Sequence, residues 1–142
     1  MIGRAREHGG IDRYIACEFE RVGSAEQLAL SFGLPGEAKW KGFGVPLAAE
    51  ALRNIGYNLA KPDRHILRAV GCWGLVDFPK WDPKKTRFPS ANPSKLLETM
   101  HAIRAFAADI EQSVSLADTT IWYVCSRGGW HLTNEQLRQL AA

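Results

Sequence analysis

Apolar residues recur every three or four positions along most of this chain, and that helical spacing limits its possible folds more than any other feature. After Gly44 the recurrence forms one apolar stripe, made of Leu47, Ala48, Ala51, Leu52 and Ile55. A longer stripe follows Pro93, made of Leu96, Leu97, Met100, Ile103, Ala107 and Ile110. Amphipathic helices produce this period, and no convincing pair of strands accompanies them. The sequence therefore predicts an all-α fold.

Capping residues set the expected helix boundaries. Ser24, Asp63 and Asn92 are typical N-caps, and Gly56 and Gly71 are typical stop signals. Two S/T-x-x-D/Q patterns, Ser115 with Asp118 and Thr133 with Gln136, resemble capping boxes. We expect helices over residues 11–21, 25–32, 45–55, 64–70, 93–112 and 116–125 and after 133, with an extended segment over 57–62 and a loop over 74–90. The length of 142 residues suits a single domain, 1–142.

Composition excludes several classes of protein. The cysteines Cys17, Cys72 and Cys125 are odd in number and widely spaced, which argues against a disulfide framework and a structural zinc site. The four histidines show no ligand spacing, so we predict no catalytic metal. No apolar run approaches the roughly 18 residues of a membrane helix, so we predict no membrane partner and a cytoplasmic location, nucleoid-associated if prokaryotic. The oligomeric state stays open.

The most informative segment is Lys39-Trp40-Lys41-Gly42-Phe43-Gly44-Val45. Its two glycines favour a tight turn between helices, with a positive φ and a close approach of the backbone to a ligand. The free N–H groups at the start of the next helix, backed by its dipole, make an anion site that fits a DNA phosphate. Lys39 and Lys41 would add positive charge. The simpler interpretation is a turn whose glycines serve geometry alone.

The segment 39–71 resembles the helix-hairpin-helix DNA glycosylase superfamily, which contains endonuclease III, the mismatch adenine glycosylase and the alkyladenine glycosylases. Gly42, Phe43, Gly44 and Ala48 match the hairpin, and Asp63 matches the family's catalytic aspartate at close to its usual separation. His65 and Arg68 match a histidine and a basic residue of the following helix, and residues 117–123 match a later core helix more weakly. The resemblance covers residues 39–126.

The resemblance implies a particular chemistry. Breaking an N-glycosidic bond builds positive charge on the deoxyribose, and a carboxylate such as Asp63 stabilises it and activates water. An aspartate before a helix is more commonly a plain N-cap, and in this family the two roles coincide. The predicted DNA contacts are Lys39, Lys41, Gly42, Phe43, Gly44, Val45 and His65. No cofactor is predicted, although the family allows a monovalent cation on the hairpin carbonyls.

Two departures from the family refine the prediction. Bifunctional members carry a Schiff-base lysine two residues past the second glycine, and Pro46 stands there, which predicts a monofunctional enzyme. Lys61, close to Asp63 in sequence, is expected to be a solvated loop lysine. Only 41 residues precede Gly42, fewer than usual, so we expect a short or minimal member of the superfamily.

Aromatic residues offer weaker signals. Residues 80–88 mix lysines with Trp81 and Phe88, as single-strand binders do, although a solvated loop is the commoner explanation. Trp122, Tyr123 and Trp130 are candidates for stacking on a flipped base, although burial in a helical core is commoner.

We therefore expect a DNA repair glycosylase that acts on double-stranded DNA and excises a damaged or mismatched base. The first alternative is a non-catalytic helix-hairpin-helix module that binds DNA without releasing a base. The second is a helical interaction protein with no nucleic-acid role, which the modest net charge of +3 favours.

Overall fold

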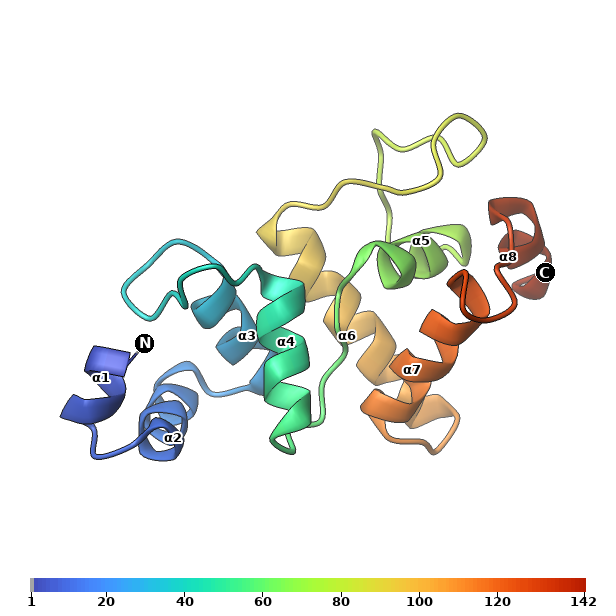
Figure 1. Cartoon of the computed structure of the whole chain (residues 1–142). Helices are drawn as coiled ribbons and strands as arrows, with labels where there is room; N and C mark the ends of the chain where they lie inside the picture. Colours follow the sequence, from blue (N-terminus) through green and yellow to red (C-terminus); the bar gives the residue numbers. More distant parts are fainter. Residues whose placement is uncertain (1) are drawn as a thin grey trace. The chain divides into compact units, whose positions relative to one another are not determined.

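The computed structural model describes residues 2–142, and within them the chain forms helices and no strand (Figure 1). The helices are α1 (Ile2–Glu7), α2 (Ile11–Val22), α3 (Ala25–Gly33), α4 (Val45–Asn54), α5 (Arg64–Cys72), α6 (Pro93–Asp109), α7 (Val114–Cys125) and α8 (Asn134–Leu140). The predicted all-α class is confirmed. The chain divides into two compact units, residues 2–57 and Asn58–Ala142. The extent of the domain, 1–142, stays a prediction.

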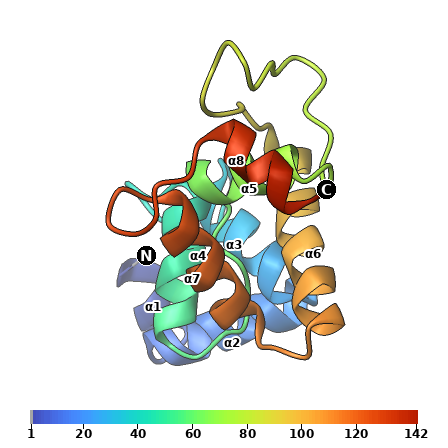
Figure 2. The same ribbon diagram turned by 90° about the vertical axis from the view of Figure 1, so that its right-hand side faces the viewer.

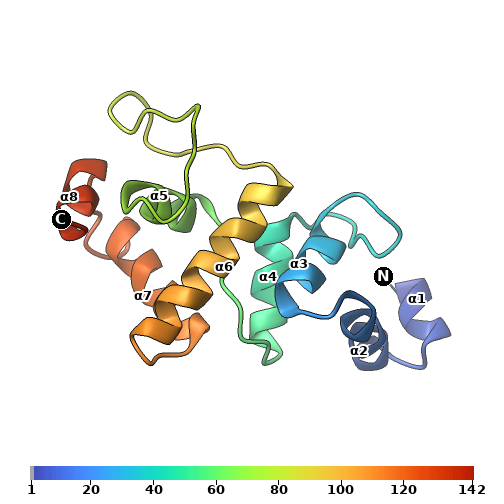
Figure 3. The same cartoon turned by 180° about the vertical axis from the view of Figure 1, so that it is seen from behind.

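Unit 1 (residues 2–57) contains α1 to α4 and is centred on the pair α3 and α4, which lie side by side (Figure 3). Gly33 allows this approach, because a Cβ there would lie 2.5 Å from the backbone N and Cα of Val45. Beside the pair, Phe32 stacks on Trp40 with ring centroids 4.1 Å apart, and the backbone amide of Trp40 donates to the Phe32 carbonyl at 2.9 Å. These contacts fix the segment that leads into α4.

Unit 2 (residues 58–142) contains α5 to α8, and α5 contacts the three other helices (Figure 2). The fully buried Arg68 ties α5 to the C-terminal part of this unit. Its Nη1 donates to the Leu132 carbonyl at 2.8 Å and to Asn134 Oδ1 at 3.2 Å, and its Nη2 donates to the Cys125 carbonyl at 3.0 Å. A buried charge is tolerated when polar acceptors replace water, and these three acceptors do so.

Most of the predicted helix starts are correct. The side chains of Ser24, Asp63 and Asn92 accept hydrogen bonds from the first-turn amides of α3, α5 and α6, and Thr133 with Gln136 forms the predicted capping box of α8. The predicted start of α7 was wrong. Ser113 is its N-cap, so Ser115 lies inside the helix.

The predicted stop at Gly71 was also wrong, because α5 continues to Cys72. Gly71 instead faces the loop before α6, where a Cβ would lie 2.6 Å from the Trp81 ring and 3.0 Å from Phe78. The loop, residues 73–92, is therefore not simply solvated. Its aromatic side chains Phe78, Trp81 and Phe88 are buried or half-buried.

No helix within residues 2–142 is long and apolar enough to cross a membrane. In the same part of the chain, no cluster of three or more histidine, cysteine or carboxylate side chains has the arrangement of a metal site.

Replacing Gly33 with alanine should destabilise unit 1. The new methyl group would meet backbone atoms of Val45 that cannot rotate away, and overpacking of this kind costs about 1–3 kcal/mol. Thermal and urea denaturation of Gly33→Ala would measure the loss. Gly3→Ala is the matched control, since nothing lies within 4 Å of a Cβ at that position. Equal stability of the two variants would contradict the close packing of α3 on α4.

Candidate nucleic-acid interface

The predicted hairpin turn lies in unit 1, directly before α4. Gly42 has the left-handed φ of 83° that the turn requires, and the Phe43 amide closes the turn on the Trp40 carbonyl at 3.0 Å. Gly44, the N-cap of α4, has an ordinary extended conformation with φ −93° and ψ 174°. Only the first glycine therefore uses its conformational freedom. Because residues 34–44 separate α3 from α4, the helix-hairpin-helix motif itself stays a prediction.

Unused amides gather at this end of α4. Among the described residues, the N–H groups of Gly44, Val45 and Leu47 donate to no acceptor, and Pro46 has no N–H. A helix of ten residues places its positive dipole end behind them. The start of α4 thus has the donors and the potential of an anion site.

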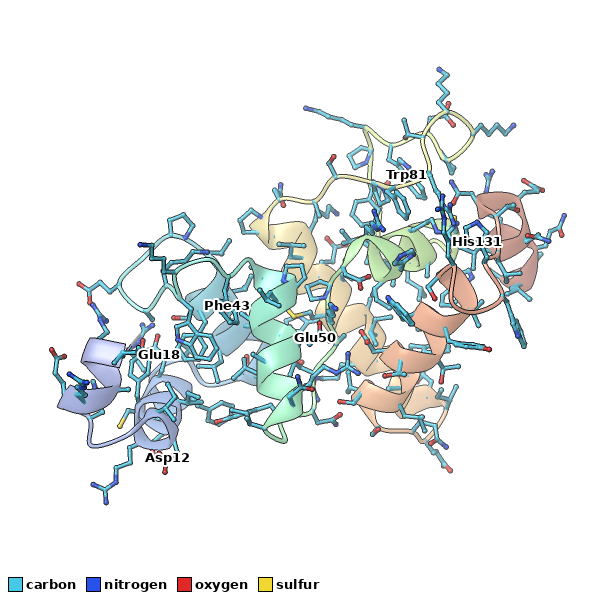
Figure 4. The ribbon with its side chains drawn as sticks, in the orientation of Figure 1. Asp12, Glu18, Phe43, Glu50, Trp81 and His131 are labelled. Atoms are coloured by element: carbon cyan, nitrogen blue, oxygen red, sulfur yellow. The ribbon has the colours of Figure 1, made fainter. Side chains whose placement is uncertain are left out.

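The side chains of the turn have structural roles. Val45 is 3% exposed beneath Gly33, and Phe43 is half-buried with its ring edge-on to Trp40 at 5.3 Å (Figure 4). Both side chains therefore serve packing rather than ligand contact.

Lys39 and Lys41 differ in their surroundings. The half-buried Lys39 ammonium donates to the carbonyls of Gly33 and Phe43, so it links the end of α3 to the turn. Lys41 is exposed. The Lys39 ammonium also lies where the glycosylase superfamily would allow a monovalent cation on a hairpin carbonyl. A fixed cation already occupies the Phe43 carbonyl, so this turn does not fit a second cation at that oxygen.

Asp63 lies in unit 2, at the N-terminus of α5. Its Oδ1 accepts from the amides of His65 at 2.8 Å and Ile66 at 3.2 Å, while Oδ2 lies 3.9 Å from the Lys61 ammonium. The Asp63 side chain is 15% exposed. One oxygen is thus fixed by capping, and the other faces a cation.

Lys61 is not the solvated loop lysine that the sequence predicts. Its side chain is only 24% exposed and ion-paired with Asp63, and its backbone N–H donates to the buried carboxylate of Asp118 at 2.8 Å. Sequence analysis could not anticipate the contact with Asp118, because that residue is 57 positions away along the chain.

His65 is held between two aromatic rings. Its imidazole lies edge-on to Phe88, with centroids 5.5 Å apart, and to Trp122 at 6.2 Å. Burial, together with the cations Arg64, Arg68 and Arg87, lowers the pKa of His65 against the opposing effect of Asp63. The ring is therefore neutral at pH 7, and its Nδ1 is buried without a hydrogen-bond partner. Its predicted contact with DNA stays a prediction.

Basic and aromatic side chains gather around Phe88, which the sequence assigned to a solvated loop. The guanidinium groups of Arg64, Arg87 and Arg68 lie 5.1, 5.3 and 5.8 Å from the centre of its ring. Cations at these distances are attracted to the face of an aromatic ring. Sequence analysis missed this cluster because its members come from α5 and from the distant loop.

Three aromatic residues are exposed where burial was the commoner expectation. Trp122 is 39% exposed, Tyr123 49% and Trp130 69%. The amphipathic pattern of α7 indicates that Trp122 and Tyr123 are exposed, because both lie off its apolar stripe. The buried residues of that stripe are Val114, Ala117, Ile121 and Cys125. Exposed aromatic rings are available for stacking on nucleic-acid bases.

Comparisons with known proteins give a partial match. No protein-family model and no solved structure matches the chain. The chain is 31% identical over 87 residues to a protein of Saccharolobus solfataricus described as an 8-oxoguanine DNA glycosylase/AP lyase. The match covers 58% of this chain and 37% of the length of that relative. The chain is thus similar to part of a DNA glycosylase.

Proposed function

We propose that this chain binds double-stranded DNA and excises a damaged or mismatched base as a monofunctional DNA glycosylase. The observation that carries the proposal is the geometry of Asp63, whose Oδ1 is fixed by two amides while Oδ2 has no part in capping and lies 3.9 Å from the Lys61 ammonium. The similarity to a named DNA glycosylase supports it independently. In this proposal Lys41 and the backbone of residues 42–45 hold a phosphate, Lys39 orders the turn, and His65 contacts the DNA near Asp63.

The proposed reaction is hydrolysis of an N-glycosidic bond. The base first leaves the helical stack, which exposes the bond to the protein. The bond between C1′ and the base nitrogen then breaks, and its electron pair leaves with the base. The Asp63 carboxylate stabilises the cation that develops on the sugar. Water adds to C1′ and gives up a proton to the carboxylate, and that proton then passes to the departed base through solvent. The products are an abasic sugar, a neutral free base and the regenerated Asp63 carboxylate.

The proposal departs from the relative in one respect. That protein is described as a lyase as well, and lyase chemistry needs an amine that forms a Schiff base with the sugar. Pro46 occupies the position at which the superfamily carries its lysine, in the first turn of α4. Lys61 lies near Asp63, where its ammonium serves the carboxylate as an ion-pair partner. We therefore propose hydrolysis without strand cleavage.

A non-catalytic DNA-binding module is the second candidate. The observation that favours it is that helix capping alone accounts for both hydrogen bonds of Asp63 Oδ1. It predicts DNA binding with no base release. A protein without a nucleic-acid role would bind no DNA at all. Either DNA-binding function implies a cytoplasmic location, associated with the nucleoid if the cell is prokaryotic.

Replacing Gly44 with valine should weaken duplex binding for all DNA sequences. The fold tolerates a side chain there, because φ is ordinary and a Cβ would meet only the Pro46 ring at 3.8 Å. The valine would, however, cover the amides that the phosphate needs. Binding isotherms at several salt concentrations measure the effect, since phosphate contacts make affinity fall with salt. Gly3→Val is the matched control, and unchanged affinity in a folded Gly44→Val protein would argue against a phosphate at the turn.

Borohydride should trap no covalent adduct between this protein and DNA that contains a damaged base or an abasic site. Trapping requires a Schiff base, and Pro46 cannot form one. Gel electrophoresis after reduction detects an adduct directly, with a known glycosylase/lyase as the positive control. Efficient trapping would refute the monofunctional assignment, and its loss in Lys61→Gln would identify the responsible amine.

Replacing Asp63 with asparagine should abolish base release while leaving DNA binding intact or stronger. Asparagine caps a helix nearly as well as aspartate, so stability should fall by at most about 1 kcal/mol. The negative charge, which the sugar cation needs, is removed, so single-turnover release should slow by orders of magnitude. The measurements are release from a panel of lesion-bearing duplexes and a melting curve.

Asp109→Asn, which removes an exposed charge at the end of α6, is the control for that experiment. Retained activity in Asp63→Asn would exclude the catalytic role. DNA binding without release from any duplex by the parent protein would instead favour the non-catalytic module.

A further inference from the structure

A basic cavity of about 380 Å³ lies in unit 2, between the loop before α6 and the start of α8. Its basic lining side chains are Arg68, Lys84, Lys85, Arg87 and His131. Glu135 is the one carboxylate among the lining residues. Every lining residue belongs to unit 2, whereas the hairpin turn belongs to unit 1.

The positive charge of this cavity is poorly compensated. Lys85 pairs with Asp82 at 3.6 Å, but within residues 2–142 neither Arg68 nor Arg87 forms an ion pair. Arg68 is fully buried, and after its Nη groups bind carbonyl and amide oxygens its Nε remains without a partner. A buried donor without an acceptor is costly unless a ligand supplies one.

Arg87 and His131 both line this cavity. His131 lies on the segment between α7 and α8 (Figure 4). Arg87 Nη2 lies 3.0 Å from His131 Nδ1, so the guanidinium donates and the imidazole accepts as a neutral ring. Desolvation and the cations Arg87, Arg127 and Arg68 lower the pKa of His131. Desolvation and neighbouring guanidinium groups likewise lower the pKa of Arg87. The cations therefore destabilise one another, and an anion between them would relieve that repulsion.

The cavity wall is held in place by Asn134. Its Nδ2 donates to the carbonyl of Pro83 at 2.8 Å, with longer contacts to the carbonyls of Thr86 and Arg87, while its Oδ1 accepts from Arg68. One amide thus fixes the loop to α5 and to the start of α8. The basic side chains project from a supported backbone, as a preorganised binding site requires.

We propose that this cavity is a second phosphate-binding site, and that its ligand is a backbone phosphate of the bound DNA. The inference rests on the proposed function for the identity of the ligand, and on the uncompensated charge for its chemistry. A guanidinium offers two parallel N–H donors that match the oxygens of a phosphate. Unit 2 would then hold the DNA through its own contact, independently of the turn before α4.

The test compares Arg87→Gln with Arg138→Gln, which removes the same charge from an exposed position in α8 outside this cavity. Arg87→Gln should weaken duplex binding about tenfold for all sequences and reduce the slope of log K against log salt by about one. Arg138→Gln should bind as the parent does. Arg87→Lys keeps the charge and should restore most of the affinity if loss of the charge, rather than of the fold, weakens binding.

A second arm uses inorganic phosphate and NMR, following the ring signals of His131 in the parent protein and in Arg87→Gln. Phosphate should shift these signals in the parent and not in the variant. If the parent binds duplex and Arg87→Gln binds it equally well, the DNA-phosphate site is refuted while the proposed function stands. If the parent binds no duplex but phosphate shifts the His131 signals, the proposed function fails and the cavity is a site for free phosphate. Neither duplex binding nor a phosphate shift would refute both.

Discussion

Unit 2 depends on one buried cation, the guanidinium of Arg68. It extends from the middle of α5 and binds oxygen atoms of three residues that lie 57 to 66 positions later, at the end of α7 and the start of α8. Since the burial of a charge requires such acceptors, α5 and the C-terminal segment hold each other in place. Asn134, one of the acceptors, then fixes the long loop, and this brings Phe88 to the guanidinium groups of Arg64 and Arg68 on α5.

In unit 1, Lys39 has a comparable role on a smaller scale. Its ammonium satisfies the carbonyl of Gly33, which ends α3, and the carbonyl of Phe43 in the turn. The turn is thus ordered by an internal cation, and the amides at the start of α4 stay unused. In both units a cationic side chain binds backbone carbonyls, and the groups proposed to contact DNA lie next to it.

Asp63 is the residue at which the two candidate functions can be compared. A glycosylase and a non-catalytic module would share the phosphate contacts and differ in whether the protein releases a base, the step in which Asp63 would act. That aspartate satisfies helix capping with one oxygen and keeps its other oxygen beside Lys61. Capping and the proposed catalysis are therefore compatible, because they would use different oxygens of the same carboxylate.

The sequence by itself determined the helices from α2 onward and most of their caps, because periodicity and capping are local properties that neighbouring residues decide; α1 was not predicted. It also determined the turn at Gly42 and the position of Asp63 before α5. Only the tertiary structure decided which cations gather around Phe88 and where Lys61 lies. Those features depend on contacts between residues far apart along the chain, and on which face of each helix packs inward. Ser115 shows the limit of local sequence patterns. Its spacing to Asp118 resembled a capping box, yet Ser113, two residues earlier, caps α7.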